Sequence, residues 1–127
     1  MMYVIIIALV LALLYYIFFR TGLVFMFLDV SGLSMYPTLQ DGEQLFSVRT
    51  YLCRPVEVGD IVVARPKACG GDKLVIKRVH SKTFSPYLQT NTYYILGDNA
   101  DESHDSRDYG WITEKEIVAK VMMNKSQ

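Results

Sequence analysis

The sequence predicts a mainly β protein, with a coiled or barrel-like antiparallel β domain behind one N-terminal transmembrane helix. Three observations lead to this prediction. Residues 1–19 contain no charge, glycine or proline. After them, short stretches rich in Val, Ile, Leu, Tyr and Phe alternate with Gly, Pro and Asp turn signals. No helical run separates these stretches, which is typical of all-β domains. A chain of 127 residues is long enough for one domain, which we place at 20–127.

Residues 1–19 are the predicted membrane anchor. At about 1.5 Å per residue, a helix of this length nearly spans the roughly 30 Å hydrocarbon core of a bilayer. A helix that is apolar on every face is not expected inside so small a domain. A cleavable signal peptide is disfavoured, because no basic segment precedes the apolar run and no small-x-small site follows it before Arg20. Arg20 on the C-terminal flank slightly favours a cytoplasmic location for the domain.

The predicted strands follow one another along the rest of the chain. The first strand leaves the anchor directly and so lies close to the bilayer surface. Asp41-Gly42, Gly59-Asp60 and the tight hairpin turn Cys69–Asp72 mark connections between later strands. The predicted strands are 23–30, 44–48, 61–64, 74–79, 93–96 and 117–123.

Composition excludes some classes of partner. The chain has 13 basic and 13 acidic residues, a formal net charge of zero, and no basic block. Nucleic acid is therefore not an expected partner. The 51% of hydrophobic residues is high for a domain of this size, and most of the excess lies in the anchor.

No metal or cofactor is expected. Asp101, Ser103 and Asp105 alternate as in a calcium loop, but the sixth position holds Ser106 and the twelfth Ile112, where an EF-hand needs glycine and glutamate. The cysteines and histidines lack the paired spacing of zinc ligands. These residues are Cys53, Cys69, His80 and His104.

Ser34 is the candidate nucleophile. It lies in the segment Val30–Leu39, after Gly32 and before Pro37. Glycine allows unusual backbone angles, and proline restricts its own φ and the residue before it. Such a segment can hold one hydroxyl in a defined place, although serine and glycine are also common in ordinary polar turns. A catalytic role for Ser34 requires a base elsewhere, because a serine hydroxyl is a poor nucleophile until its proton is removed.

Lys77 is a better candidate base than either histidine. His80 and His104 have no clear carboxylate partner in the sequence, and scattered histidines are usually surface residues. Lys77 lies within the apolar strand 74–79, where its side chain either faces water or is buried; lysine is rarely buried. If it is buried, apolar surroundings lower its pKa from about 10.4 and favour the neutral amine. Arg78 would then lie on the opposite face of the strand.

Three segments match the sequence motifs of one protein family, and they occur in the same order along the chain. They are Ser31–Leu39, Gly59–Val63 together with Ile76–Val79, and Gly97–Arg107. With the apolar N-terminus ahead of them, the chain resembles the type I signal peptidases over essentially its whole length. Each motif alone is weak evidence, whereas all three in sequence are highly specific.

The resemblance implies a Ser–Lys dyad in a membrane-anchored serine endopeptidase. Ser34 matches the nucleophile of the family and Lys77 matches the general base. Ser103 matches a serine whose hydroxyl positions the lysine amine. Asp105 and Arg107 match a structural ion pair beside the site.

The resemblance also implies an oxyanion site, and the chain departs from the family pattern in three respects. The backbone N–H of Ser34 would be one oxyanion donor. Gly32 stands where some members carry a serine as the second donor, with Ser31 one residue earlier. Ala100 replaces the usual arginine, and His80 follows Val79 where other residues are commoner. A large second lobe is missing, so the chain resembles a minimal catalytic core of the bacterial or organellar type.

The substrate implied by the resemblance is an extended signal peptide with a small-x-small cleavage site, Ala-x-Ala in type. It would add as a strand along Leu28–Val30 and Val75–Lys77. Leu28 and Val30 would form the pocket for the third residue before the cut. The residues implied to line the pocket for the residue before the cut are Val30, Met35, Leu39 and Ile76, and those implied to contact substrate as a whole are Leu28, Val30, Met35, Leu39, Val75 and Ile76.

The family places its catalytic domain on the extracytoplasmic face of the membrane, and this implication overrides the single Arg20. That compartment permits disulfides. Cys53 and Cys69 would then form a disulfide or remain two buried thiols, and the sequence leaves both outcomes open.

Other functions remain open at this stage. The same chemistry would suit a specialised processing peptidase for a pilin or conjugation precursor. A self-cleaving repressor shares the Ser–Lys dyad and the β fold, but the anchor and the lack of a DNA-binding helical domain count against it. A catalytically inactive domain that binds extended peptides is disfavoured by the presence of Ser34, Lys77 and Ser103.

Overall fold

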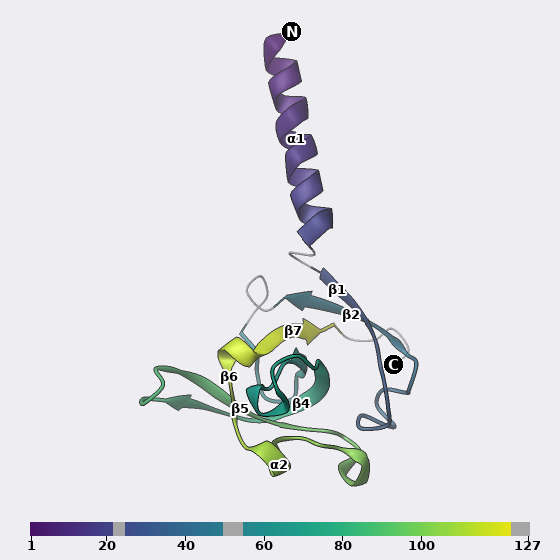
Figure 1. The fold of residues 1–127 in the computed structure, drawn as a ribbon, viewed down its shortest axis with the longest axis vertical. Coiled ribbons are helices and arrows are strands. Elements are labelled where there is room, and N and C mark those ends of the chain that lie inside the picture. The colour runs from purple at the N-terminus through teal and green to yellow at the C-terminus, as the bar shows by residue number, and fades with distance from the viewer. Residues whose placement is uncertain (22–24, 50–54, 123–127) are drawn as a thin grey trace.

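A computed structural model of the chain describes residues 1–21, 25–49 and 55–122, without the side chains of 19–21. One long helix, α1 (Met2–Thr21), stands out from a β domain (Figure 1). Seven strands form one antiparallel sheet in the order β1-β2-β7-β3-β4-β5-β6. The strands are β1 (Phe25–Asp29), β2 (Gln44–Arg49), β3 (Ile61–Ala64), β4 (Val75–Ser85), β5 (Thr90–Leu96), β6 (Ile112–Thr113) and β7 (Ile117–Val121).

The mainly antiparallel β prediction is confirmed, and the sheet curls into an open half-barrel (Figure 1). Short helical turns connect some of the strands. These are η2 (Lys67–Cys69), η3 (Ala100–Glu102), α2 (Ser106–Tyr109) and η4 (Glu114–Glu116). Within the part of the chain that the structure describes, no helix meets the length and hydropathy that a membrane span requires. The predicted transmembrane helix therefore stays a prediction.

The core lies on both faces of the curled sheet. Successive side chains of a strand point to opposite faces, and in β3 Val62 and Val63 are both completely buried but belong to different clusters. One cluster is Val56, Val62, Ala64, Val79, Tyr93, Ile95, Ile112 and Ile117. The other is Val30, Met35, Leu39, Leu45, Val63, Ala119 and Val121. A sheet covered on both faces explains why its central strands read as continuous apolar runs.

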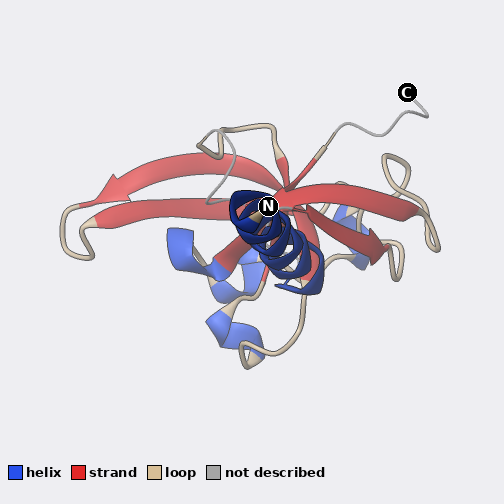
Figure 2. Ribbon diagram, turned by 90° about the horizontal axis from the view of Figure 1, so that it is seen from above, coloured by secondary structure: helices blue, strands red, loops and turns tan. Residues whose placement is uncertain are grey.

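The β4–β5 hairpin differs most from the strand prediction. The strand expected at 74–79 continues to Ser85, and the strand expected at 93–96 begins earlier, at Thr90. The two strands pair as far as Ser85↔Thr90. Seen from above along α1, the hairpin reaches away from the centre of the sheet (Figure 2). Its outer part mixes polar residues with the exposed Phe84, Tyr87 and Leu88, so it lacks the regular apolar alternation on which the prediction depended. β6, with two residues, and α2, with four, were not predicted because they are too short to show a pattern.

Candidate active site

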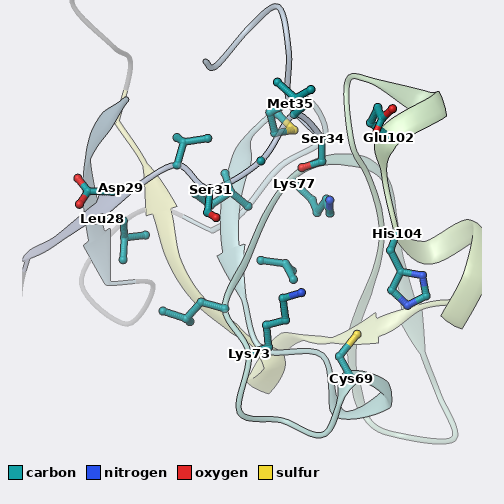
Figure 3. A pocket seen from close by; sticks show the side chains of 16 residues that line it. Leu28, Asp29, Ser31, Ser34, Met35, Cys69, Lys73, Lys77, Glu102 and His104 are labelled. Atoms are coloured by element: carbon teal, nitrogen blue, oxygen red, sulfur yellow. The ribbon is translucent and has the colours of Figure 1, made fainter. Parts of the chain in front are cut away.

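A pocket of about 330 Å³ opens between the end of β1 and the start of β4 (Figure 3). Ser34 and Lys77 both line it, although they come from segments far apart in the sequence. Figure 3 shows the side chains of Ser34 and Lys77 among those that line the pocket. The lining residues are Leu28, Asp29, Val30, Ser31, Gly32, Leu33, Ser34, Met35, Cys69, Lys73, Leu74, Val75, Ile76, Lys77, Glu102 and His104.

Ser34 lies in a series of turns after β1. Gly32 has a φ of +91°, a conformation that glycine adopts far more readily than other residues. Its backbone N–H donates to Asp41 Oδ1 at 2.8 Å. Met35, the residue after Ser34, is 1% exposed and is buried in the core. The turn is therefore anchored on both sides of Ser34, whose own side chain is half-buried at the pocket.

The loop after β5 holds this turn in place. The backbone N–H of Asn99 donates to the carbonyl oxygen of Ser34 at 2.8 Å. The Asn99 side chain donates to the carbonyl oxygen of Leu33 at 2.9 Å. Thr38 Oγ1 donates to Asp98 Oδ2 at 2.6 Å. The position of Ser34 therefore depends on two neighbouring residues that lie beyond β5.

Arg78 connects the same loop to β4. Its guanidinium donates two hydrogen bonds to the carboxylate of Asp98, at 2.9 and 2.8 Å. A third hydrogen bond joins Arg78 Nη1 to the carbonyl oxygen of Gly59 at 2.9 Å. The hydrogen bonds from Arg78 hold the pKa of Asp98 below its ordinary value. Because Arg78 follows Lys77 directly, Asp98 links the strand that carries the lysine to the turn that carries the serine.

Lys77 is buried, with 4% of its surface exposed. It shares a face of β4 with Val75 and Val79, which both pack in the interior. Arg78 lies on the opposite face, as predicted, with 36% of its side chain exposed. The Lys77 amine donates a hydrogen bond to Ser103 Oγ at 3.1 Å. Burial lowers the pKa of this amine, which favours the neutral form that a general base requires.

Asp105 organises the far side of Lys77. Its carboxylate is completely buried and accepts hydrogen bonds from Ser103 Oγ at 2.7 Å and from the backbone N–H of Gly97 at 2.8 Å. Arg107 binds both carboxylate oxygens, at 2.9 and 2.6 Å. Burial alone would raise the pKa of Asp105, but the hydrogen bonds from Arg107, Gly97 and Ser103 outweigh it and hold the pKa well below its usual range.

Gly97 is required at the meeting point of these groups. A Cβ atom there would lie 2.1 Å from Ser103 Oγ and 2.7 Å from the carbonyl oxygen of Ser34. Both distances are far below van der Waals contact. The absence of a side chain therefore allows the Ser34 turn and Ser103 to approach the same point.

Most of the predicted site residues come together here. Ser34, Lys77, Gly32, Leu28, Val30, Met35, Val75 and Ile76 line the pocket, and Ser103, Asp105 and Arg107 lie behind Lys77. Leu39 is 2% exposed in the core and is not among the residues that line the pocket. Cys69 lines the pocket, whereas Cys53 lies outside the described residues, so the Cys53–Cys69 disulfide stays a prediction.

His104 has a carboxylate partner that the sequence analysis did not identify. Its Nδ1 lies 3.2 Å from Asp108 Oδ2, and it lines the pocket with a side chain that is 71% exposed. The signal that could have revealed Asp108 is its spacing of four residues from His104. Asp98 and Asn99 were read as part of a motif but not as groups that hold the Ser34 turn.

Two comparisons with known proteins both match signal peptidases. A family model described as signal peptidase, peptidase S26, matches residues 1–83 and 80–124. Signal peptidase I of Buchnera aphidicola subsp. Baizongia pistaciae (strain Bp) is 37% identical over 49 residues, which cover 39% of this chain. The matched segment spans 16% of the length of that relative.

Proposed function

Because the chain belongs to the signal peptidase S26 family, we propose that it is a membrane-anchored serine endopeptidase that removes N-terminal signal peptides from secreted precursors. The observation that carries the proposal is the burial of Lys77, 4% exposed, at the pocket that Ser34 also lines. A lysine is rarely buried without a role. Here burial lowers the pKa of the amine and so favours the neutral form that could activate a serine hydroxyl.

The hydrogen bonds around Ser103 support a general-base role for Lys77. An ionised carboxylate can only accept hydrogen bonds, so the Ser103 hydroxyl donates its single proton to Asp105 at 2.7 Å. Ser103 therefore has only lone pairs to offer Lys77, whose amine donates to it at 3.1 Å. A neutral amine has one lone pair, which this contact does not use. That lone pair is available to the Ser34 hydroxyl on the pocket side.

The reaction then follows in two halves. The Ser34 oxygen bonds to the scissile carbonyl carbon as its proton passes to Lys77 Nζ. The carbon–nitrogen bond breaks as the Lys77 ammonium gives this proton to the leaving amine, which leaves an ester on Ser34. A water molecule attacks the ester in the same way, with Lys77 taking its proton and returning it to Ser34 Oγ. Lys77 is neutral at the start and at the end.

The oxyanion would bind to the backbone N–H of Ser34. Within the described residues this N–H has no hydrogen-bond acceptor, which leaves it free for a developing negative charge. The N–H of Gly32 is already bound to Asp41. Ser31 also lines the pocket (Figure 3), and its hydroxyl is the side-chain donor closest in sequence to the expected second position.

Two strand edges support binding of an extended peptide. In the described part of the chain, β1 pairs only with β2. Residues Val75–Lys77 pair with β3 on one side, and β5 joins β4 only from Arg78 onward. A substrate strand would hydrogen-bond to both edges across the pocket. Val30 and Met35 line the pocket beside Ser34 and would contact the side chain before the cut, which we infer to be a small one such as alanine.

α1 would hold the domain at a lipid bilayer. Every side chain from Met2 to Phe18 is exposed, and nearly all of them are apolar. Exposed apolar surface of this extent favours transfer out of water. The domain would lie on the extracytoplasmic face, where precursors emerge. Flotation of the full chain with lipid vesicles tests the anchor, and protection from an added protease in sealed membranes tests the orientation.

The decisive assay uses the purified full chain in detergent and a precursor peptide with an Ala-x-Ala site. We expect one cut after the second alanine, located by mass spectrometry. Ser34→Ala should abolish the cut, and Ser81→Ala, the same change outside the pocket, should retain it. Cleavage by the Ser34→Ala variant at the wild-type rate would contradict the proposal. A panel of secretory and pilin precursors compares the alternative substrates.

A further inference from the structure

A second lysine lines the pocket that contains the proposed general base. Lys73 lies in the loop between η2 and β4, and its side chain is exposed. Figure 3 shows its amine directed into the pocket, on the side that faces Lys77. Lys73 has no part in the proposed proton transfers, so its position requires a separate explanation.

The charge of Lys73 is not compensated. Among the residues that the structure describes, no ion pair or hydrogen bond involves its side chain, whereas Lys82 pairs with Glu57 and Lys120 with Asp60. A lysine side chain is an ammonium group in water at neutral pH. The pocket therefore contains a permanent ammonium group beside an amine that must stay neutral.

Of the charged groups near Lys77 that the structure describes, Lys73 is the one whose charge is not balanced by a neighbouring group. Asp105 would attract a proton to Lys77, but Arg107 binds its carboxylate directly. The carboxylates of Asp29 and Glu102 lie at the rim and point away from Lys77 (Figure 3). The titratable and charged groups that face Lys77 or line its pocket are Asp29, Cys69, Lys73, Glu102, His104, Asp105 and Arg107.

We propose that Lys73 is a positioning residue for the reaction, acting through Lys77 as a fixed positive charge that disfavours a second ammonium in the pocket. The proposal rests on the proposed Ser–Lys function. Two like charges at one site repel each other, so the neutral amine of Lys77 is favoured. The burial of Lys77 is the largest cause of its lowered pKa. Among the charged groups, Lys73 also lowers this pKa, whereas Asp105 raises it.

The size of the effect follows from the exposure of Lys73. Water and salt screen an exposed charge, which limits its effect on a neighbouring charge. Loss of this charge should therefore reduce the neutral fraction of Lys77 about two- to threefold at pH values below its midpoint. At higher pH, where Lys77 is neutral in any case, nothing should change.

The test is an NMR titration of the Lys77 side chain in the full-length protein labelled with ¹³Cε-lysine. Its signal is assigned by its loss in Lys77→Ala. We expect Lys73→Gln to move the midpoint to higher pH and Lys73→Arg to leave it in place. Lys67→Gln is the matched control, because Lys67 is exposed in η2, shortly before this loop, but does not line the pocket. Added salt should reduce the difference between wild type and Lys73→Gln.

A midpoint in Lys73→Gln equal to that of the wild type would overturn the inference. So would an equal loss of kcat/KM at every pH, since that pattern indicates contact with substrate. The expected kinetic result is a two- to threefold loss confined to the lower pH range. If no form of the protein cleaves a precursor, the proposed function fails, but the titration still decides whether Lys73 acts on Lys77.

Discussion

The amine of Lys77 donates a hydrogen bond to the hydroxyl of Ser103 across 3.1 Å. This contact fixes the direction of the amine, because Ser103 is itself held by Asp105 at 2.7 Å. The base is thus positioned by a chain of hydrogen bonds that ends in the ion pair of the buried Asp105 with the exposed Arg107.

Ser103→Ala should lower kcat about 100-fold and change KM little. The variant keeps Ser34 and Lys77 but removes the acceptor that aligns the amine, so the loss should appear in the chemical step. Steady-state kinetics on the Ala-x-Ala peptide measures both constants. Ser85→Ala, at the tip of the β4–β5 hairpin, is the control. A wild-type kcat in Ser103→Ala would show that the amine is held by other groups.

Gly97→Ala should abolish activity and destabilise the domain by about 2 kcal/mol. The new Cβ would lie 2.1 Å from Ser103 Oγ and 2.7 Å from the Ser34 carbonyl oxygen, so one of the two segments must move. Thermal unfolding and peptide cleavage measure the two effects.

The control for Gly97→Ala is Gly110→Ala. Gly110 has a φ of +82° and open space around an added Cβ, so its replacement strains the backbone without blocking the site. This variant should lose stability but keep its activity. Full activity in Gly97→Ala would contradict the close approach of Ser34 and Ser103.

Asp105→Asn should destabilise the domain, because a neutral amide at this buried position cannot accept all the hydrogen bonds that the carboxylate accepts from Arg107, Gly97 and Ser103. The pKa of Asp105 is lower in the folded than in the unfolded state. The stabilisation of the fold by the Asp105 charge is therefore complete above the pKa of an unfolded aspartate, about 3.9. It is lost as the pH falls through the pKa of Asp105 in the folded state.

Urea unfolding between pH 2 and pH 7 measures this linkage. The wild type should lose stability on acidification more steeply than Asp105→Asn. Asp101→Asn, the same substitution at an exposed position, controls for the change in net charge. Parallel curves for the wild type and Asp105→Asn would rule out a stabilising role for the Asp105 charge.

His104→Gln should keep kcat/KM within about threefold of the wild type and leave its pH dependence unchanged. His104 and Asp108 form a pair at the pocket, but their side chains are 71% and 47% exposed, so they lack the burial of Lys77. A pH–rate profile of the variant is the check. Loss of its rising limb would assign the base to the histidine instead.

The sequence led to the prediction that Ser34, Lys77 and Ser103 belong to one site, because three motifs in order restrict the chemistry strongly. The structure brings the three residues together at one pocket, and their catalytic roles stay predictions. It could not decide whether Lys77 is buried, since the alternating positions of its strand are apolar on both faces. Val75 and Val79 share its face, but Leu74 and Ile76 occupy the other. The burial comes from the pairing of Val62 with Lys77 and from the curl of the sheet, which are tertiary features.

The contacts that hold the Ser34 turn were beyond sequence analysis for a related reason. Asn99 and Ser34 are far apart along the chain and meet only because β5 ends beside the pocket. Arg78 and Asp98 read equally well as two solvated charges. Leu39 has the same apolar character as the residues that line the pocket, and only the fold separates it from them.

The most direct test of the account is the pH dependence of kcat/KM for the Ala-x-Ala peptide, measured from pH 6 to pH 10 with Lys77→Arg beside the wild type. Because burial lowers the pKa of Lys77, wild-type activity should rise with pH and level off below the ordinary lysine value of about 10.4. Lys77→Arg should be inactive throughout, because arginine stays charged. A flat wild-type profile, or a cleaving Lys77→Arg variant, would contradict the claim that a neutral Lys77 activates Ser34.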